Sequence, residues 1–336
     1  MFTPVNLITG FLGSGKTTLL QRLLADPALA DTAILINEFG EIGLDHHLLE
    51  RIDETMVLLK SGCLCCTVRG ELSKAMKDLL FKRERGAVPF FRRLVIESTG
   101  LADPFPILST VQADSVLQHH FRLGNVITTI DAVNGVGRPE SIKQMAVADR
   151  LVLTKTDLTA DTSALLSKIR EVNPDAPLVR SAEEPIVASS LFGDGARLPM
   201  RAPPPSTGGP HGSVYSFALT FDGALDWTMF VIWLTMMLNR HGDRVLRVKG
   251  ILNVEGSATP VAIHGVQHLV HPPAHLAAWP DDHRRHSCLV FIVDGLDRTA
   301  IERSLGAFMG KPAESSGQPV LPRDPSAVQP WRQPMS

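Results

Sequence analysis

The sequence predicts an α/β fold, in which a mostly parallel sheet covered by helices is followed by a small α+β domain. Three observations carry this prediction. In the first half of the 336-residue chain, short apolar runs alternate with longer amphipathic stretches, as in a parallel sheet covered by helices. A glycine-rich loop ending in Lys16 and Thr17 directly follows the first apolar run. A segment rich in proline and glycine, 201–212, separates the two halves.

The elements of the first domain follow from these runs. Strands are expected at 5–9, 33–37, 56–59, 94–97, 126–131 and 151–154. Helices are expected at 17–24, 71–83 and 160–172, the last of them stopped by Asn173 and Pro174.

The second domain is expected to hold three or four strands backed by two helices. Its strands are predicted at 213–219, 245–251, 261–264 and 289–293, and one helix at 298–308. The other helix is expected to place one apolar stripe toward the core, made of Trp227, Phe230, Val231, Leu234 and Leu238. The expected domain limits are 1–190 for the first domain, 191–212 for the linker, 213–312 for the second domain and 313–336 for a disordered tail.

Composition excludes several classes of function. The net charge is −2, from 33 basic and 35 acidic residues mixed along the chain, so we expect no nucleic-acid partner. The most apolar run, 227–238, is much shorter than the roughly 20 residues that a membrane span needs. The amino terminus lacks the pattern of a signal peptide, and three of the four cysteines crowd together, which suits a reducing compartment. We therefore expect a cytoplasmic protein without a membrane partner.

The loop Gly10-Phe-Leu-Gly-Ser-Gly15-Lys16-Thr17 has the spacing of a P-loop, which binds nucleotide phosphates. Its backbone N–H groups and the following helix N-terminus attract anions, Lys16 would reach the β and γ phosphates, and the hydroxyl of Thr17 would reach Mg²⁺. The alternative is a glycine-rich turn without a ligand. The residues expected to hold the phosphates are Gly10, Gly13, Ser14, Gly15, Lys16, Thr17 and Thr18.

Two further segments complete the predicted nucleotide site. The strand that ends at Glu97 is followed by Gly100, a spacing that suits a carboxylate near Mg²⁺ and a backbone N–H at the γ phosphate. Lys16, Thr17 and Glu97 are therefore the predicted catalytic residues. The segment Thr154-Lys155-Thr156-Asp157 would read guanine, because a carboxylate accepts from both N–H groups of that base. Most GTPases have asparagine where this chain has Thr154.

A cysteine motif lies between these segments. Cys63, Cys65 and Cys66 stand in Gly62-Cys-Leu-Cys-Cys-Thr67, and three thiolates with a fourth ligand suit Zn²⁺ or another thiophilic metal. The alternative is a buried trio of small apolar side chains. Glu38, in a switch-like segment after the second strand, is a further candidate metal ligand, as are Thr17 and Glu97 for Mg²⁺.

These motifs together resemble the CobW-like proteins, a family that includes zinc chaperones and proteins associated with cobalamin synthesis and nitrile hydratase activation. The resemblance covers nearly the whole chain and includes Arg247-Val-Lys-Gly250 and Gly265-Val-Gln-His268 in the second domain. It implies a GTPase whose nucleotide state controls delivery of a metal to a client protein, with the cysteine trio as metal ligands. Some relatives carry a histidine-rich linker, whereas only His211 stands here.

The favoured function is therefore GTP-dependent metal delivery to an unidentified metalloprotein client. The expected ligands are GTP or GDP, Mg²⁺ and Zn²⁺, and homo-oligomerisation stays open. The alternatives are cobalt or iron insertion, a metal buffer with GTP as a structural ligand, and a small-molecule kinase. Two weaker signals remain. Six histidines crowd the second domain, and they are expected to act separately rather than as one metal site: His264, His268, His271, His275, His283 and His286. Cys288 is expected to face inward from a strand.

Overall fold

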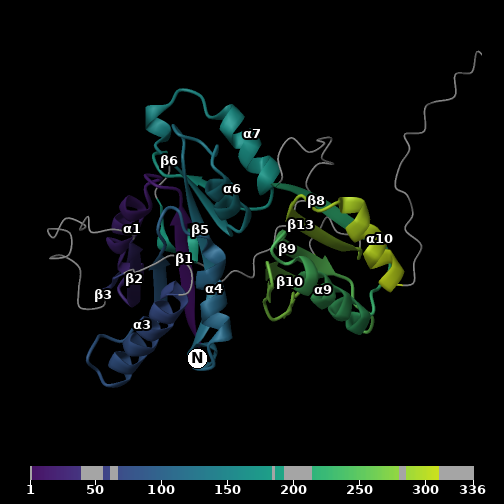
Figure 1. Ribbon diagram of the computed structural model, residues 1–336, viewed down its shortest axis with the longest axis horizontal. Coiled ribbons are helices and arrows are strands. Elements are labelled where there is room, and N and C mark those ends of the chain that lie inside the picture. Colours follow the sequence, from purple (N-terminus) through teal and green to yellow (C-terminus); the bar gives the residue numbers. More distant parts are fainter. Residues whose placement is uncertain are drawn as a thin grey trace, which may run out of the picture.

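The computed structural model describes residues 2–38, 56–60, 67–183, 186–192, 214–279 and 285–309, with the backbone alone at 37–38, 56–60 and 67–69. These residues form two sheets, each with its own helices (Figure 1). The cysteine motif, most of the expected linker, the expected tail and His283 lie outside the described residues.

The first sheet has seven strands, and every pair in it is parallel. Its order is β3-β2-β4-β1-β5-β6-β7. The strands are β1 (Thr3–Gly10), β2 (Thr32–Glu38), β3 (Met56–Lys60), β4 (Arg93–Glu97), β5 (Phe121–Asp131), β6 (Arg150–Thr154) and β7 (Leu178–Arg180). The six strands predicted for this domain are thus found, and the short β7 adds a seventh. Because all the strands run the same way, the ends of β1, β4, β5 and β6 meet at one edge of the sheet.

Helices cover both faces of this sheet. Its helices are α1 (Lys16–Leu24), α3 (Thr67–Glu84), α4 (Pro104–Ala113), α5 (Leu117–His120), α6 (Pro139–Ala146), α7 (Ser163–Val172) and α8 (Ala188–Phe192), with short 3₁₀ turns at Pro27–Leu29 and Thr156–Leu158. Neighbouring residues of β1 divide between the two faces: Leu7 packs with α3 and α4, whereas Ile8 packs with α1 and α8. Strands buried on both faces explain the continuous apolar runs in the sequence.

The second sheet is antiparallel and has six strands, in the order β11-β10-β9-β13-β8 with β12 beside β10. The strands are β8 (Val214–Phe221), β9 (Val245–Leu252), β10 (Val261–Val266), β11 (Leu269–Val270), β12 (Ala274–His275) and β13 (Ser287–Asp294). Helices α9 (Trp227–His241) and α10 (Arg298–Phe308) pack on one face around Trp233, Phe230 and Phe291. Cys288 is buried in β13, as predicted.

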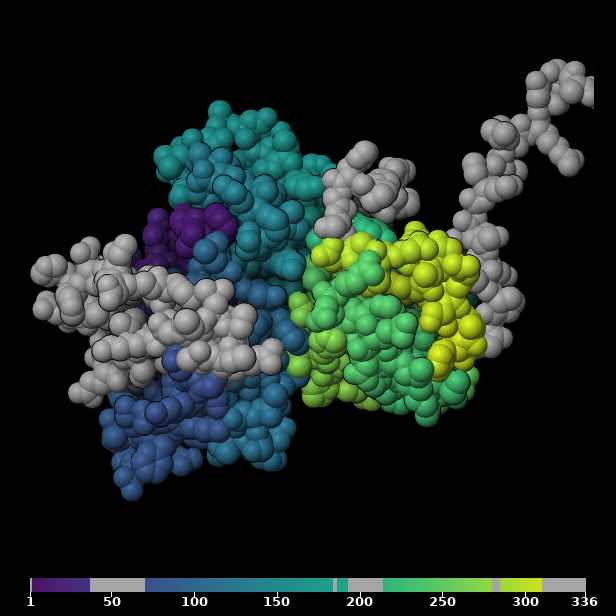
Figure 2. Space-filling view, viewed as in Figure 1, coloured from purple at the N-terminus to yellow at the C-terminus, as the bar shows by residue number. Residues whose placement is uncertain are grey.

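The two domains lie against each other (Figure 2). A register shift between β9 and β13 at Val245–Arg247 lets two consecutive residues of β9 face the first domain. Leu246 packs in a cluster with α6 and α7, and the buried guanidinium of Arg247 donates to the carbonyl of Val147 and to the carboxylate of Asp149. The hydroxyl of Ser216 adds a bond to the carbonyl of Glu171 (2.8 Å).

Several expectations about single elements were wrong. The described residues of the second domain form six strands rather than three or four, because β11 and β12 are two-residue strands that form by pairing with β10. The helix expected at 160–172 begins at Ser163, because Asp161 accepts from the backbone N–H of Ser163 and ends the preceding loop (2.8 Å). In α9, Val231 is 37% exposed, and Trp233 and Met237 take the place expected for it in the core.

The first domain extends slightly into the expected linker. Helix α8 contains the first two residues of that linker, Leu191 and Phe192, and both pack in the core of the first domain. Among the described residues, no helix is long and apolar enough to cross a membrane.

Candidate functional site

The phosphate-binding loop, 10–17, connects β1 to α1 at the centre of the parallel sheet. Gly10, Gly13 and Gly15 all have positive φ (142°, 72° and 87°), a backbone conformation that other residues rarely adopt. At Gly10 a β-carbon would also lie 2.3 Å from the hydroxyl of Thr129. The three glycines therefore set the curled path of the loop, which is the conformation that turns backbone N–H groups toward phosphates.

Side chains at the ends of the neighbouring strands β5 and β6 hold this loop in place. The hydroxyl of Ser14 bonds that of Thr129 on β5 (2.6 Å), and the hydroxyl of Thr154 on β6 donates to the carbonyl of Ser14 (2.9 Å). The carbonyl of Ile130 lies 3.1 Å from the same hydroxyl and is an alternative acceptor for its single proton. Thr154, which stands where most GTPases have asparagine, thus joins the phosphate loop to the segment predicted to read guanine, 154–157. This segment is termed the base-reading segment.

The ammonium of Lys16 lies within the loop. It donates to the carbonyls of Gly10 (3.0 Å) and Phe11 (3.2 Å), and the residue is only 8% exposed. A cation held by loop carbonyls at the start of a helix is placed to meet the β and γ phosphates of a nucleotide.

Thr17 and Glu97 lie together at the end of β4. The hydroxyl of Thr17 donates to a carboxylate oxygen of Glu97 (2.8 Å), and Glu97 is buried at 4% exposure. Hydroxyl and carboxylate oxygens are the ligands that Mg²⁺ prefers, so the donor set fits a magnesium ion beside the phosphate loop. Both residues were predicted for this role from sequence.

The segment after β4 passes close to the loop. A β-carbon at Gly100 would lie 2.5 Å from the backbone nitrogen of Leu12, so only glycine fits there. The buried amide of Gln144, on α6, donates to the carbonyls of Gly100 and Ala102 (3.1 Å each) and holds this segment in place. The next residue, Leu101, is 57% exposed.

The base-reading segment follows β6. Lys155 has a positive φ of 58°, and its ammonium pairs with Asp131 at the end of β5 (2.6 Å). Burial raises the pKa of Asp131, but the hydrogen bonds from Lys155, Asn134 and the backbone outweigh burial and hold that pKa below its usual range. Asp157, predicted to accept from guanine, is exposed. The backbone N–H of Ser181, directly after β7, donates to the carbonyl of Leu153 (2.9 Å).

Sequence reasoning missed Asp131 and Gln144 as parts of this site. A signal for Asp131 existed, because a carboxylate that ends a strand beside the Thr154 strand must lie at the same sheet edge. Gln144 had no such signal, since its role depends on how α6 packs.

The expected metal site can be placed only in part. The backbone of Glu38 ends β2, paired with Lys60, which ends β3. The motif with Cys63, Cys65 and Cys66 lies between β3 and α3 and outside the described residues. Within the described ranges, no three histidine, cysteine or acidic side chains could hold a metal. Among the described histidines of the second domain, His268 pairs with Asp243 (3.0 Å), His275 is exposed, and His264 stacks on His271. That the six histidines act separately stays a prediction.

Two family descriptions match the chain. Residues 4–180 match the nucleotide-binding domain described as CobW/HypB/UreG. Residues 214–309 match the C-terminal domain of the cobalamin synthesis protein CobW.

Individual relatives agree with this match. The zinc chaperone YjiA of Escherichia coli is 32% identical over 302 residues, which cover 86% of this chain and 93% of YjiA. The zinc chaperone CobW of Pseudomonas aeruginosa is 27% identical over 347 residues, covering 90% of each chain. The crystal structure of the Zn(II)-bound YjiA GTPase from Escherichia coli superposes with a TM-score of 0.71 at 27% identity, covering 92% of this chain and 99% of that one.

Proposed function

The chain belongs to the CobW family of P-loop proteins, and from this premise we propose that it is a GTP-hydrolysing metallochaperone that binds Zn²⁺ and delivers it to a client protein. The observation that carries the nucleotide part is the 2.8 Å contact between Thr17 and Glu97, which joins the phosphate loop to the end of β4. The metal part is supported by the cysteine motif and by relatives named as zinc chaperones.

The residues of the site divide the work of GTP hydrolysis. Lys16 would bind the β and γ phosphates, and the N–H of Gly100 would meet the γ phosphate. Thr17 and Glu97 would hold Mg²⁺, which neutralises charge on the phosphates when bound. Lys155 and Asp157 would select guanine, because Asp157 accepts from two donors that adenine does not offer as a pair.

Metal binding would be coupled to the nucleotide through the sheet edge. The metal ligands would be Cys63, Cys65 and Cys66, with Glu38 as a further candidate. Strand β3 ends at Lys60, three residues before this motif, at the same edge as Glu38. GTP and Mg²⁺ would set the positions of the segments around Glu38 and Glu97 and so change the geometry of the cysteine motif between them in sequence. Hydrolysis would then reset the affinity for the metal.

The test is a competition titration of Zn²⁺ against a chromophoric chelator, run once with GDP and once with a non-hydrolysable GTP analogue. Because linkage is reciprocal, we expect the two states to differ in zinc affinity by a factor of about 5 to 150, with an equal effect of zinc on nucleotide affinity. Zinc affinity should also decrease at lower pH, because a thiol must ionise to coordinate.

Superimposable titrations would reject the coupling and leave a metal buffer in which GTP only stabilises the fold. A triple variant with serine at 63, 65 and 66 should lose the zinc stoichiometry while still binding GTP. Unchanged stoichiometry in that variant would reject the cysteine site. The same titration with Co²⁺ and Fe²⁺ compares zinc with the other metals that the family resemblance leaves open.

A further inference from the structure

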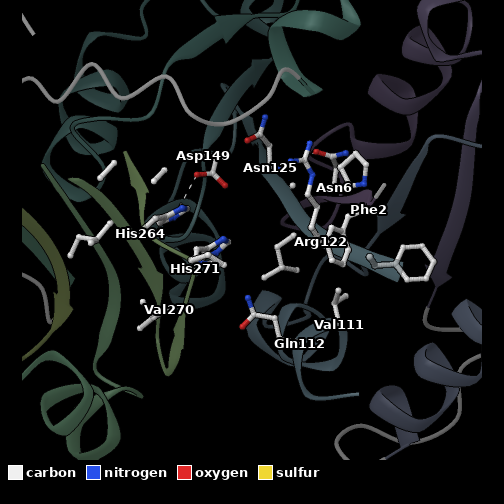
Figure 3. Close-up of a pocket in the computed structure, with 18 of the residues that line it drawn as sticks. Phe2, Asn6, Val111, Gln112, Arg122, Asn125, Asp149, His264, Val270 and His271 are labelled. Carbon is white, nitrogen blue, oxygen red and sulfur yellow. Dashed lines mark hydrogen bonds and ion pairs between the residues drawn. The ribbon is translucent and has the colours of Figure 1, made fainter. Parts of the chain in front are cut away.

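A pocket lies between the two domains, at the amino-terminal edge of the parallel sheet and so opposite the phosphate loop. Its volume is about 670 Å³, within the range of small-molecule sites. One wall comes from the starts of β1 and β5 and the end of α4, and the other from β9, β10 and the segment 270–276. Figure 3 shows His264 and His271 on the second-domain wall, facing Asn6, Arg122 and Asn125 across the cavity.

We propose that this pocket binds a small organic anion, in which a carboxylate or phosphate is carried on an apolar body. Nothing in the proposed metal delivery uses the pocket, so the two proposals stand apart.

The first argument is an unsatisfied donor on the pocket wall. Asn6 is 1% exposed, and its side-chain oxygen accepts from the backbone N–H of Asn125 (2.8 Å). Because that oxygen accepts, the other end of the amide must be the nitrogen, and this nitrogen is buried without a hydrogen-bond partner among the described residues. A β-carbon at Gly124 would lie 2.5 Å from the Asn6 oxygen, so only a glycine at this position leaves room for the amide. A buried donor without an acceptor calls for a partner from outside the protein.

The second argument is charge. Lys249 and Arg122 line the pocket, and Asp149 is the one acidic residue among the described lining residues. Both oxygens of Asp149 are engaged, one by the guanidinium of Arg247 and the other by the backbone N–H of Val126 (2.9 Å). Lys249 lies 3.8 Å from Asp149. Asp175, outside the lining, also acts on Lys249. At 3.8 Å the ion pair of Lys249 with Asp149 is longer than a hydrogen bond, so an anion in the pocket would be a closer partner for this ammonium.

Burial is the main influence on the pKa of the titratable groups of this wall. Burial, with Arg247 adding, lowers the pKa of Lys249 to about 8. Burial and Arg247 likewise hold the pKa of His264 well below its usual range, and its buried Nε2 has no hydrogen-bond partner in the part of the chain that the structure describes. Near neutral pH the ammonium of Lys249 thus remains mostly charged, and it is the cation that an anion in the pocket would meet.

A metal ion fits this wall less well than an anion. Asp149 is the acid nearest to the two imidazoles, with His264 3.8 Å from its carboxylate, but Arg247 already takes that oxygen. No set of three metal-binding side chains was found in the part of the chain that the structure describes.

The rest of the wall is apolar, which argues for an organic body on the anion. Its apolar side chains include Phe2, Val111, Phe121, Ile263 and Leu276. Inorganic phosphate would leave this surface uncovered, whereas an aromatic or branched carbon skeleton would bury it.

The test is calorimetric titration of the full chain, saturated with GDP so that the phosphate loop is occupied. The probes are phenyl phosphate, benzoate and the uncharged benzyl alcohol. We expect at least one of the two anions to bind, and benzyl alcohol to bind about tenfold more weakly or not at all. Tighter binding of phenyl phosphate assigns a phosphate ligand, and tighter binding of benzoate assigns a carboxylate.

Two variants locate the binding. Asn6→Asp keeps the oxygen that accepts from Asn125 but turns the free donor into an acceptor, and Lys249→Met removes the cation. Each should weaken the anion about tenfold or more, and Lys168→Met, on the exposed side of α7, should not. GDP affinity, measured in parallel, shows whether each variant is folded. If Asn6→Asp does not fold, Lys249→Met still tests the proposal.

Three results would overturn the proposal. The first is that neither anion binds at concentrations on the order of 10 mM. The second is that benzyl alcohol binds as tightly as the anions, and the third is that Lys249→Met binds the anion as tightly as wild type. None of these results touches the proposed GTP-dependent metal delivery, which is read at the opposite edge of the sheet.

Discussion

The guanidinium of Arg247, on β9 of the second domain, donates to the carboxylate of Asp149, the residue immediately before β6 of the first domain. Both side chains are buried. Strand β6 ends at Thr154, which bonds the phosphate loop, and is followed by Lys155. The pair therefore anchors the second domain to the strand that carries the base-reading segment.

Removing one partner of this pair should be costly. We expect Arg247→Met to lower the free energy of unfolding by about 3–5 kcal/mol, because it leaves the Asp149 carboxylate buried without its cation. Urea unfolding followed by tryptophan fluorescence measures this, and adding Asp149→Asn should recover part of the loss. The control is Arg298→Met, which breaks an exposed pair with Glu302 and should cost less than about 0.5 kcal/mol. Equal unfolding midpoints for Arg247→Met and wild type would contradict the anchoring role.

Acid should destabilise the domain interface through His264. Its pKa in the folded protein lies well below 6.5, because of burial and then Arg247, and the pKa of its stacking partner His271 is lowered by burial. Below pH 6.5 the unfolded chain therefore binds protons that the folded chain does not, so stability is complete above that pH and decreases as the pH falls. The charged groups around the ring are Arg247 and Lys249 on β9 and Asp149 before β6.

Thermal unfolding between pH 7.5 and 5 tests this expectation. His264→Gln should flatten the pH dependence, whereas His275→Gln, on an exposed strand residue of the same sheet, should leave it as in wild type. An acid response in His264→Gln as steep as that of wild type would assign the effect to other groups. Below about pH 4 protonation of Asp149 adds a second loss, because Arg247 holds its pKa below the usual range against the opposing effect of burial.

Lys16→Ala should lower the rate of GTP hydrolysis by about a hundredfold or more, because it removes the cation placed for the β and γ phosphates. Zinc stoichiometry should stay as in wild type, since the thiolates and not the lysine would hold the metal. Phosphate release and a chelator titration give the two readouts, with Lys168→Ala on α7 as the control. Loss of all zinc from a folded Lys16→Ala protein would show that the two sites are not separable.

Guanine selectivity should depend on Asp157. Asp157→Asn replaces an acceptor by a donor, so GTP should bind about tenfold or more weakly and xanthosine triphosphate more tightly. Fluorescent nucleotide displacement measures both affinities, and the neighbouring exposed Asp161→Asn is the control. Wild-type protein that binds ATP and GTP equally well would refute the assignment.

Intrinsic GTP hydrolysis should be slow. The best-known switch GTPases have a water-orienting glutamine directly after the glycine, where this chain has the exposed Leu101. We expect fewer than about 10⁻² turnovers per second for the isolated, metal-free protein, and acceleration by bound zinc or a client. A fast rate without metal would count against the switch.

The sequence predicted those parts of the site in which the signal is local. The phosphate loop, Glu97 and Gly100 stand in short patterns whose spacing follows from the chemistry of phosphates, and the structure brings them together. The two-residue strands β11 and β12 could not be found in this way, because their extended form depends on β10.

A short helix also escaped prediction. Helix α6 has eight residues, and the three apolar side chains on its inner face, Ile142, Met145 and Ala146, are too few to establish a helical period in the sequence. The pairing of Arg247 with Asp149 depends on how the domains dock, since the two residues are 98 positions apart. For the same reason the pocket with Asn6 and Lys249 had no signal before the fold was known.

The burial of Cys288 has a practical consequence for labelling chemistry. Burial, with Asp175 adding, raises the pKa of this thiol to about 11, so at neutral pH only on the order of one molecule in ten thousand carries the reactive thiolate. The chain has four cysteines in all. Any thiol that maleimide or a disulfide reagent modifies rapidly in the native protein therefore belongs to the trio at 63, 65 and 66. Protection of those thiols by zinc can accordingly be followed by mass spectrometry without mutating Cys288.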